Sequence, residues 1–373
     1  MSKRIVGTMV LCAFSVFGCE NPSDPITPSL AEVQADVVAA DLAPCDEDFT
    51  ISSQADVGRF DPACGVLDGS LSITGVSEES LDLSPLGTLI EITGSLKIEY
   101  NPGLVTLSAS EGLPLESLIH VGLGLWVEHN PELTISPNFD ALADIGLSLR
   151  VRFNPKLENL PHLSALTSVG NWLGIIGNDK LTTLSGLESI HTVGNKVRVA
   201  WNRDLVDVSQ LSGLQTVGGD LEIYGNPALA SVVGPNALES VGGNLFITEN
   251  EQLSQVTGFN GLTMVGGNLE IARNVPPPPE LEGAGVSGAQ AAEAMEEVEE
   301  PGDPPPPPPG VWGRVAIERN PGLRTIDGFH GLPAVGGDFI IRGNPSLTHL
   351  PGFSGVGSVG RGWKACTLSK MRP

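Results

Sequence analysis

The chain has 373 residues and a formal net charge of −24, with 44 acidic and 20 basic side chains. An acidic balance of this size argues against nucleic-acid binding, because it repels the phosphate backbone. The acids are spread along the chain, so they indicate solubility and define no single acidic site.

The chain begins with the features of an export signal. Lys3 and Arg4 precede an apolar run from Ile5 to Phe17, which is too short to span a membrane. We therefore predict a signal peptide at residues 1–18. The next residue completes Val-Phe-Gly-Cys, which resembles the bacterial lipobox, and the resemblance implies that Cys19 carries a lipid anchor at the cell envelope. Phe17 departs from the small residue usual there, and plain secretion is the alternative.

An acidic stretch follows the signal. Residues 20–58 hold nine acids, four prolines and no Lys or Arg. Such a composition cannot bury a core, so we predict a disordered tether at 19–44 that holds the rest of the chain off a surface.

From residue 45 onward the chain consists of a repeat that an asparagine closes. The spacings are 29, then 24 six times, then 46, then 24 residues. The asparagines are Asn101, Asn130, Asn154, Asn178, Asn202, Asn226, Asn250, Asn274, Asn320 and Asn344. Apolar residues recur 3, 6, 9, 12, 15, 19 and 21 residues after each one. A fixed period predicts a solenoid, and the spacing of two at the end of the unit predicts a strand. We therefore expect an all-β fold of about 11 coils of 24 residues each, over 45–274 and 311–365.

The asparagine occupies an inward slot where an apolar residue would be expected. A buried amide must be hydrogen-bonded, and stacked asparagines can bond the turn backbone of their own coil and the next. We predict a structural asparagine ladder with no role in ligand binding.

Cys45 and Cys64 stand at the start of the repeats. In an exported protein this pair predicts a disulfide that closes the N-terminal end of the solenoid. We expect no metal, because no histidine lies near either cysteine.

Cys45, the segment Cys-Gly-Val-Leu-Asp-Gly-Ser-Leu-Ser-Ile at 64–73, and the repeated Val-Gly-Gly-x-Leu-x-Ile-x-x-Asn-Pro-x-Leu resemble the receptor L domain. This leucine-rich-repeat-like family also occurs in bacterial surface lipoproteins. The resemblance covers residues 45 to about 365, and it implies a right-handed, single-stranded β-helix. The coils outnumber those of one receptor L domain, so the ligand contacts of the receptors do not carry over.

Two stretches interrupt the repeat. One coil is five residues longer than the others near 110–114, which predicts a bulged loop. Residues 275–310 hold two proline runs around an acidic, alanine-rich centre, where a normal coil has 14 residues. We favour a disordered surface insertion, and a proline-rich peptide ligand is the alternative. The tail at 366–373 leaves the pattern.

Large side chains gather at positions that we expect to face outward from the strands. The candidate binding residues are Tyr100, Trp126, Arg150, Arg152, Phe153, Arg198, Trp201, Tyr224 and Phe246. Aromatic and arginine side chains dominate binding hot spots, and aromatic rings also stack on sugars. The alternative is that strand positions simply favour aromatic residues.

We expect no enzyme and no cofactor. The six histidines are scattered, and no nucleophile–base set or phosphate loop occurs. Glu99 and Glu128 stack on adjacent coils beside Arg152, for which we expect an exposed charge ladder, although a paired-carboxylate site for glycoside chemistry is conceivable. The sequence thus predicts a surface recognition or adhesion module for protein or glycan. A structural envelope spacer is the alternative, and a polysaccharide-active enzyme is a distant third.

Overall fold

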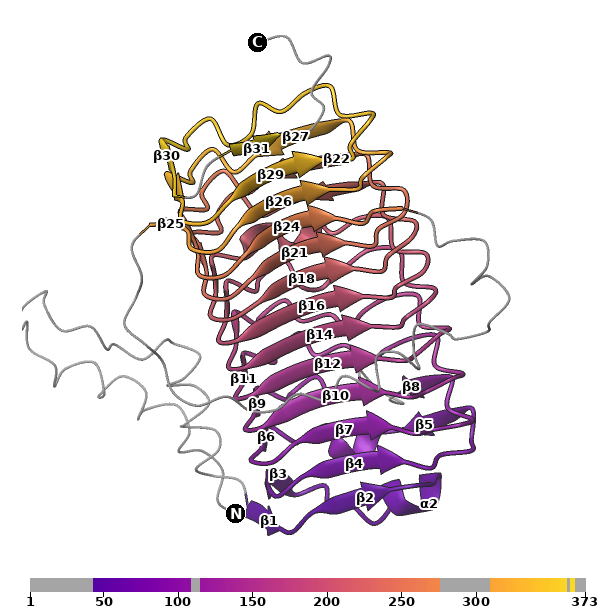
Figure 1. Ribbon diagram of the computed structural model, residues 1–373. Coiled ribbons are helices and arrows are strands. Elements are labelled where there is room, and N and C mark those ends of the chain that lie inside the picture. The colour runs from indigo at the N-terminus through magenta and orange to yellow at the C-terminus, as the bar shows by residue number, and fades with distance from the viewer. Residues whose placement is uncertain (1–42, 109–114, 276–308, 361–362, 366–373) are drawn as a thin grey trace, which may run out of the picture. The chain divides into compact units, whose positions relative to one another are not determined.

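The computed structural model describes residues 43–108, 115–275, 309–360 and 363–365. They form a β-solenoid of about 11 turns with almost no helix, which confirms the predicted fold class. In each turn the chain lays one strand beside the equivalent strand of the turn before (Figure 1). The predicted signal peptide, Cys19, the tether except for its last two residues, most of the proline-rich stretch and the tail lie outside the described residues.

Two parallel sheets of 13 strands each run through the described part of the solenoid. The long-strand sheet contains β2 (Phe49–Ile51), β4 (Leu71–Thr74), β7 (Leu96–Glu99), β10 (Gly124–Glu128), β12 (Ser148–Arg152), β14 (Trp172–Ile176), β16 (Lys196–Ala200), β18 (Leu221–Tyr224), β21 (Leu245–Thr248), β24 (Leu269–Ala272), β26 (Val315–Glu318), β29 (Phe339–Arg342) and β31 (Trp363–Ala365). The short-strand sheet contains β1 (Ala43–Asp46), β3 (Cys64–Asp68), β6 (Glu91–Ile92), β9 (His120–Val121), β11 (Asp144–Ile145), β13 (Ser168–Val169), β15 (Thr192–Val193), β17 (Thr216–Val217), β20 (Ser240–Val241), β23 (Met264–Val265), β25 (Gly310–Val311), β28 (Ala334–Val335) and β30 (Ser358–Val359).

A third side of the coil is strand only in places. It forms one sheet of β5 (Ser80–Asp82) and β8 (Thr106–Ser108), and one of β19 (Ser231–Val233), β22 (Gln255–Gly258) and β27 (Thr325–Gly328). In the described ranges, the helical elements are α2 (Gln54–Val57) and the 3-10 turns η2 (Ser84–Leu86) and η3 (Ser209–Gly213).

The constant period of the sequence becomes a constant register in space. Trp126 of β10 lies opposite Arg150 of β12, and Arg150 lies opposite Gly174 of β14, each 24 residues further on. Beyond residues 276–308, β26 pairs with β24 and β25 pairs with β23. The coils on either side of that stretch therefore belong to one stack.

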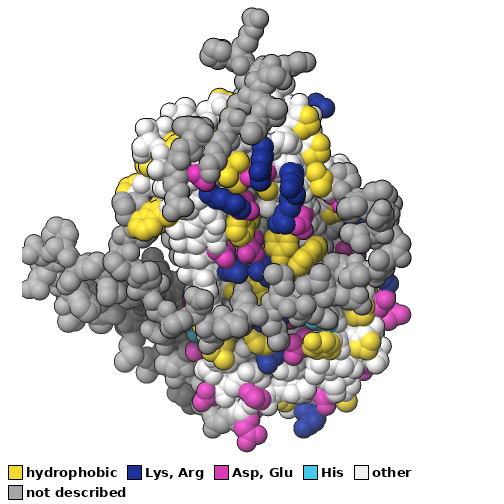
Figure 2. All heavy atoms as spheres, viewed as in Figure 1, with side chains coloured by type: hydrophobic (Ala, Val, Ile, Leu, Met, Phe, Trp, Pro, Cys, Tyr) yellow, Lys and Arg dark blue, Asp and Glu magenta, His cyan; other side chains and the backbone are white. Residues whose placement is uncertain are grey.

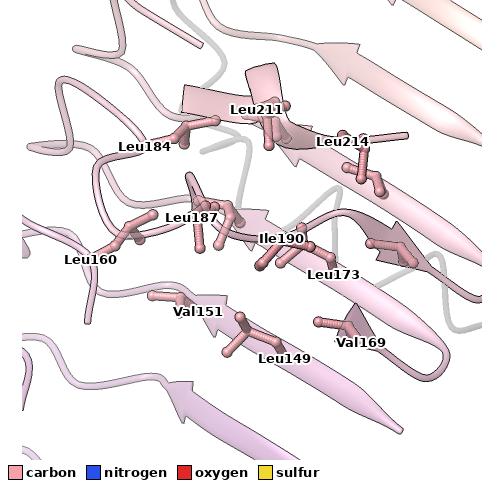
Figure 3. Packing of buried hydrophobic residues seen from close by; sticks show 14 of the residues in the cluster. Leu149, Val151, Leu160, Val169, Leu173, Leu184, Leu187, Ile190, Leu211 and Leu214 are labelled. Atoms are coloured by element: carbon pink, nitrogen blue, oxygen red, sulfur yellow. The ribbon is translucent and has the colours of Figure 1, made fainter. Parts of the chain in front are cut away.

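The core is made of the repeated apolar slots, each stacked on its counterpart one turn away. Leu149 of β12 pairs with Leu173 of β14, and both point inward beside the leucines of the irregular segments (Figure 3). In the last coils phenylalanine takes one of these slots. Phe259 stacks on Phe329 with 4.9 Å between ring centroids, and Phe329 stacks on Phe353 with 5.1 Å. Burial of these ladders is the main stabilising force of the fold.

The asparagines form a buried hydrogen-bonded ladder beside this core. The backbone N–H and the Nδ2 of Asn130 donate to the Oδ1 of Asn154 over 3.1 and 3.0 Å. The Nδ2 of Asn154 in turn donates to the carbonyl oxygen of Val127 in the preceding turn over 2.8 Å. Each amide is thus satisfied mainly by the turns before and after it, which explains why a polar residue occupies an apolar slot.

The N-terminal end carries a cap. Cys45 of β1 and Cys64 of β3 lie at disulfide distance, with 5.8 Å between their Cα atoms, as the sequence predicts. The Gln54 side chain of α2 also bonds the backbone N–H and carbonyl of Asp82 over 2.8 and 3.0 Å. These contacts tie the edge of the first turn to the next one.

Candidate functional site

A second hydrophobic cluster lies on the outer side of the long-strand sheet, away from the core. Trp172, Ile176 and Ala200 are buried in it, and Phe153, Trp201 and Tyr224 pack against them. Along β14 the inward residues alternate with these outward ones, and all five residues of the strand are buried. Figure 2 shows hydrophobic, basic and acidic side chains gathered over the middle of this sheet.

Indole rings and cationic groups alternate next to this cluster. The Arg150 guanidinium lies between the rings of Trp126 and Trp172, 4.9 and 4.6 Å from their centroids. Lys97 lies 4.7 Å from the Trp126 ring on its other side. The Trp172 ring lies against Gly174, where an added Cβ would come within 2.8 Å of the indole. The glycine therefore lets the ring lie close to the sheet, within cation–π distance of the Arg150 guanidinium.

The carboxylates of this face are neutralised by arginines one turn away. Arg152 donates hydrogen bonds from Nε and Nη2 to the two carboxylate oxygens of Glu128 over 3.0 and 2.8 Å, and Glu128 is 5 % exposed. The expected exposed charge ladder is therefore wrong for Glu128, because the guanidinium and its neighbours cover the carboxylate.

Arg198 is buried as well. It is 7 % exposed and donates from Nε to Glu222 over 2.6 Å. Its guanidinium lies 5.8 Å from the Tyr224 ring centroid. Of the candidate binding residues, Arg198 therefore serves to hold this face together, with its charge already matched by a carboxylate.

Three candidate aromatic residues lie just beyond the strands, where the sequence placed them within the strands. Tyr100, Phe153 and Trp201 each directly precede a ladder asparagine and have φ values of 53–55°. The left-handed backbone lets the next residue turn its amide into the ladder, and it swings the aromatic side chain to the rim of the sheet. His129 has the same conformation at 55°, and it stacks on Tyr100 with 4.6 Å between ring centroids.

An open groove of about 710 Å³ runs along this rim. Its lining comes from the residues just before and just after five successive ladder asparagines, namely His129, Pro131, Phe153, Pro155, Gly177, Asp179, Trp201, Arg203, Gly225 and Pro227. A Cβ on Gly177 would lie 2.7 Å from the Phe153 ring, and one on Gly225 would lie 2.7 Å from the Trp201 ring. Each ring thus lies over the glycine of the following turn, in space that a side chain at that glycine would fill.

Asp179 and Arg203 lie in the middle of the groove, at the position where its other three turns have Pro131, Pro155 and Pro227. Burial raises the pKa of the Asp179 carboxyl, while the positive charge of Arg203 acts in the opposite direction. Within the described part of the chain, neither side chain makes a hydrogen bond or an ion pair. The groove therefore offers one acceptor group and one donor group between aromatic rings.

The structure brings together most of the candidate binding residues, but not all of them. Phe153 and Trp201 line the groove, Tyr224 supports Trp201 edge to face at 4.8 Å, and Tyr100 stacks on a groove residue. Phe246 lies opposite Glu222 and Glu270 on the adjacent strands and takes no part in the outer cluster.

The sequence reasoning missed five residues of this surface: His129, Trp172, Gly177, Asp179 and Arg203. A signal for three of them was present. Asparagine is followed by proline in most turns, but by Asp179 and Arg203 in two consecutive turns, and Gly177 interrupts a run of ring-bearing residues. Proline is also absent after Asn250 and Asn274, so this signal becomes specific only together with the ring-bearing residues before Asn130, Asn154 and Asn202.

No family model, curated protein or solved structure matched the chain in the three comparisons. In the residues that the structure describes, no group of three or more His, Cys, Asp or Glu side chains is arranged to hold a metal ion. No helix within the described ranges is long and apolar enough to cross a membrane.

Proposed function

We propose that this chain is a recognition or adhesion module of the cell surface, which binds protein or glycan through its outer aromatic surface. The observation that carries the proposal is the second hydrophobic cluster, which lies outside the solenoid core and opens into a groove. Exposed aromatic surface next to polar groups is characteristic of binding sites, and folding of the coils does not require it.

The proposed location rests on the sequence. The basic and apolar N-terminus, with Cys19 after it, favours a lipid-anchored envelope protein, and the acidic stretch after it favours a tether. The proposed kinship with receptor L domains rests on the repeat motif, and a stacked solenoid is consistent with it.

The second candidate function is a structural spacer of the envelope. A stack of about 11 turns provides length whatever its surface carries. An enzyme of the glycosidase kind is less well supported, because the carboxylate of Glu128 is already held by Arg152. A carboxylate whose two oxygens both accept hydrogen bonds from a guanidinium has little left to offer a substrate in a paired-carboxylate mechanism.

A capture experiment separates recognition from a spacer role. The full-length exported protein is presented to a glycan array and to extracted surface proteins of neighbouring cells, beside the double variant Trp126→Ala with Trp201→Ala. We expect the wild type to retain a partner and the variant to retain at least tenfold less, because aromatic anchors dominate binding energy. Equal capture by both proteins, or capture of nothing by the wild type, contradicts recognition through this surface.

A further inference from the structure

The groove has the chemistry of a sugar site, and this inference rests on the recognition function proposed above. We propose that the groove between His129 and Pro227 binds a neutral oligosaccharide that runs along the solenoid axis. Sugar rings stack on Phe153 and Trp201, and their hydroxyl groups bond Asp179 and Arg203.

The stacking surfaces follow from the repeat. Phe153 and Trp201 occupy equivalent positions two turns apart, which at the spacing of parallel strands is about 10 Å. Each ring lies over a glycine, Gly177 or Gly225, and both rings line the groove. Two aromatic rings at this separation suit two sugar rings of one chain, since the faces of pyranose rings are apolar.

The position of each aromatic ring is fixed by its neighbours. Trp201 is held edge to face by Tyr224, and Phe153 contacts His129 with 4.8 Å between ring centroids. Both rings also pack on the buried cluster of Trp172, Ile176 and Ala200. A site whose aromatic residues are already held in place loses little side-chain entropy on binding.

The polar groups fit hydroxyl groups best. Asp179 offers acceptor oxygens, and Arg203 offers a fork of donors one turn away. A sugar hydroxyl can donate to the first and accept from the second at once. A proline-rich peptide, which also favours aromatic grooves, has no N–H at its prolines and would leave the partly buried carboxylate of Asp179 without a partner.

The charge balance selects a neutral sugar. The groove carries one carboxylate and one guanidinium, and the whole chain has a formal net charge of −24. A uronic-acid or sulfated polysaccharide would be repelled by this field before it reached the single arginine. A neutral chain meets no such barrier.

The test measures binding to the full-length exported protein by calorimetry. The neutral probes are a set of tetrasaccharides that includes cellotetraose, maltotetraose, xylotetraose and chitotetraose. A tetragalacturonate serves as the acidic probe, and a decaproline peptide serves as the proline-rich probe. We expect at least one neutral tetrasaccharide to bind and the tetragalacturonate not to bind. Trp201→Ala and Asp179→Ala should each weaken the binding about tenfold or more, since each removes a central contact.

Two further variants make the test specific to the groove. Gly177→His puts a side chain where the Phe153 ring lies, since even a Cβ there would come within 2.7 Å of that ring, and it should abolish binding by displacing this stacking surface. The same left-handed turn position already carries histidine at 129. Arg319→Ala changes the same turn position, with φ of 57°, beyond the groove, and should bind as the wild type does. Circular dichroism reports whether each variant keeps its fold.

The outcomes separate this inference from the recognition function. Saccharide binding that survives Trp201→Ala and Gly177→His overturns the groove as the sugar site. Decaproline binding that both variants abolish, without saccharide binding, overturns the sugar and leaves recognition intact. Capture of a surface protein without any saccharide binding also overturns the sugar site and leaves the recognition function intact. If the protein binds none of the probes and captures no partner, both proposals are wrong.

Discussion

At the scale of single residues, this protein uses one backbone position for two purposes. The residue before each ladder asparagine adopts a left-handed conformation in turn after turn, whether it is glycine, as at Gly177, or aromatic, as at Phe153. L-residues pay a conformational penalty there, which the asparagine ladder offsets through its hydrogen bonds. The side chain at this position is left free to vary, and the candidate groove is built from that variation.

Tyr224 provides a residue-scale prediction. Burial raises its pKa to about 12; the nearby charge of Arg198 opposes this shift, and those of Glu222 and Glu249 add to it. In the variant Tyr100→Phe, Tyr224 is the only tyrosine of the chain. We expect its tyrosinate absorbance to rise with a midpoint of about 12 in the folded protein, and near 10 in urea.

The same shift gives the sign of a stability change. Because the folded state holds the phenolic proton up to a higher pH than the unfolded state, this contribution is fully present below pH 10 and is lost as the pH rises toward 12. Urea unfolding of Tyr100→Phe followed by circular dichroism measures it. A folded-state midpoint near 10 would show that Tyr224 is not buried against Trp201.

At the scale of structural elements, the coil is held together by links to its neighbours rather than by bonds within itself. Strands of two to five residues, such as β13 and β14, pair only with the turns before and after them. The asparagine ladder adds a polar link at the end of each long strand, and Asp220, Asn244 and Asn268 form a second, shorter ladder at the strand starts. A substitution that breaks a link in one turn should therefore destabilise the adjacent turns as well.

Asn154→Ala tests this coupling. The change removes the acceptor of the Asn130 backbone N–H and side-chain amide and the donor to the Val127 carbonyl. Buried polar groups without partners cost about 1–3 kcal/mol each. We expect the free energy of unfolding to fall by about 3 kcal/mol or more, with faster amide exchange in the turns that contain Asn130 and Asn154.

Asn159→Ala is the matched control, because this asparagine is exposed on the same coil. Its effect on the free energy of unfolding should stay within about 0.5 kcal/mol, as for other surface changes. Equal losses in the two variants would mean that the ladder contributes no more than an exposed asparagine.

At the scale of the whole molecule, the solenoid continues across residues 276–308 without a change of register. β24 pairs with β26, and the ladder itself crosses the gap, since Asn274 donates from Nδ2 to the Oδ1 of Asn320 over 2.8 Å. The last turns are too few to bury a core alone, so they depend on the stack before them.

Cleavage at a protease site placed within 276–308 tests this dependence. We expect the two fragments to stay together in gel filtration and to unfold in a single transition, because the sheets and the core hold them across the cut. Residues 309–373 expressed alone should lack β-structure by circular dichroism. Separation of the cleaved fragments into two folded pieces would contradict a single solenoid.

The sequence by itself determined the solenoid, its period, its inward ladders and the cysteine pair of its cap. This was possible because a stacked coil repeats its burial pattern at every turn, so that spacing along the chain equals position in the stack. Leu173 and Asn178 could be assigned from their place in the repeat alone.

Only the tertiary structure decided which outward residues form a site. A left-handed turn moved Phe153 and Trp201 to the rim, and a carboxylate on the next strand buried Arg198. The position of the aromatic rings and the burial of Arg198 depend on the size, charge and direction of side chains that are 24 residues apart. These outward side chains differ from one pair of turns to the next. The repeat determines the backbone position of each outward side chain. Contacts between neighbouring turns determine whether these side chains form an ion pair, a buried cluster or a groove.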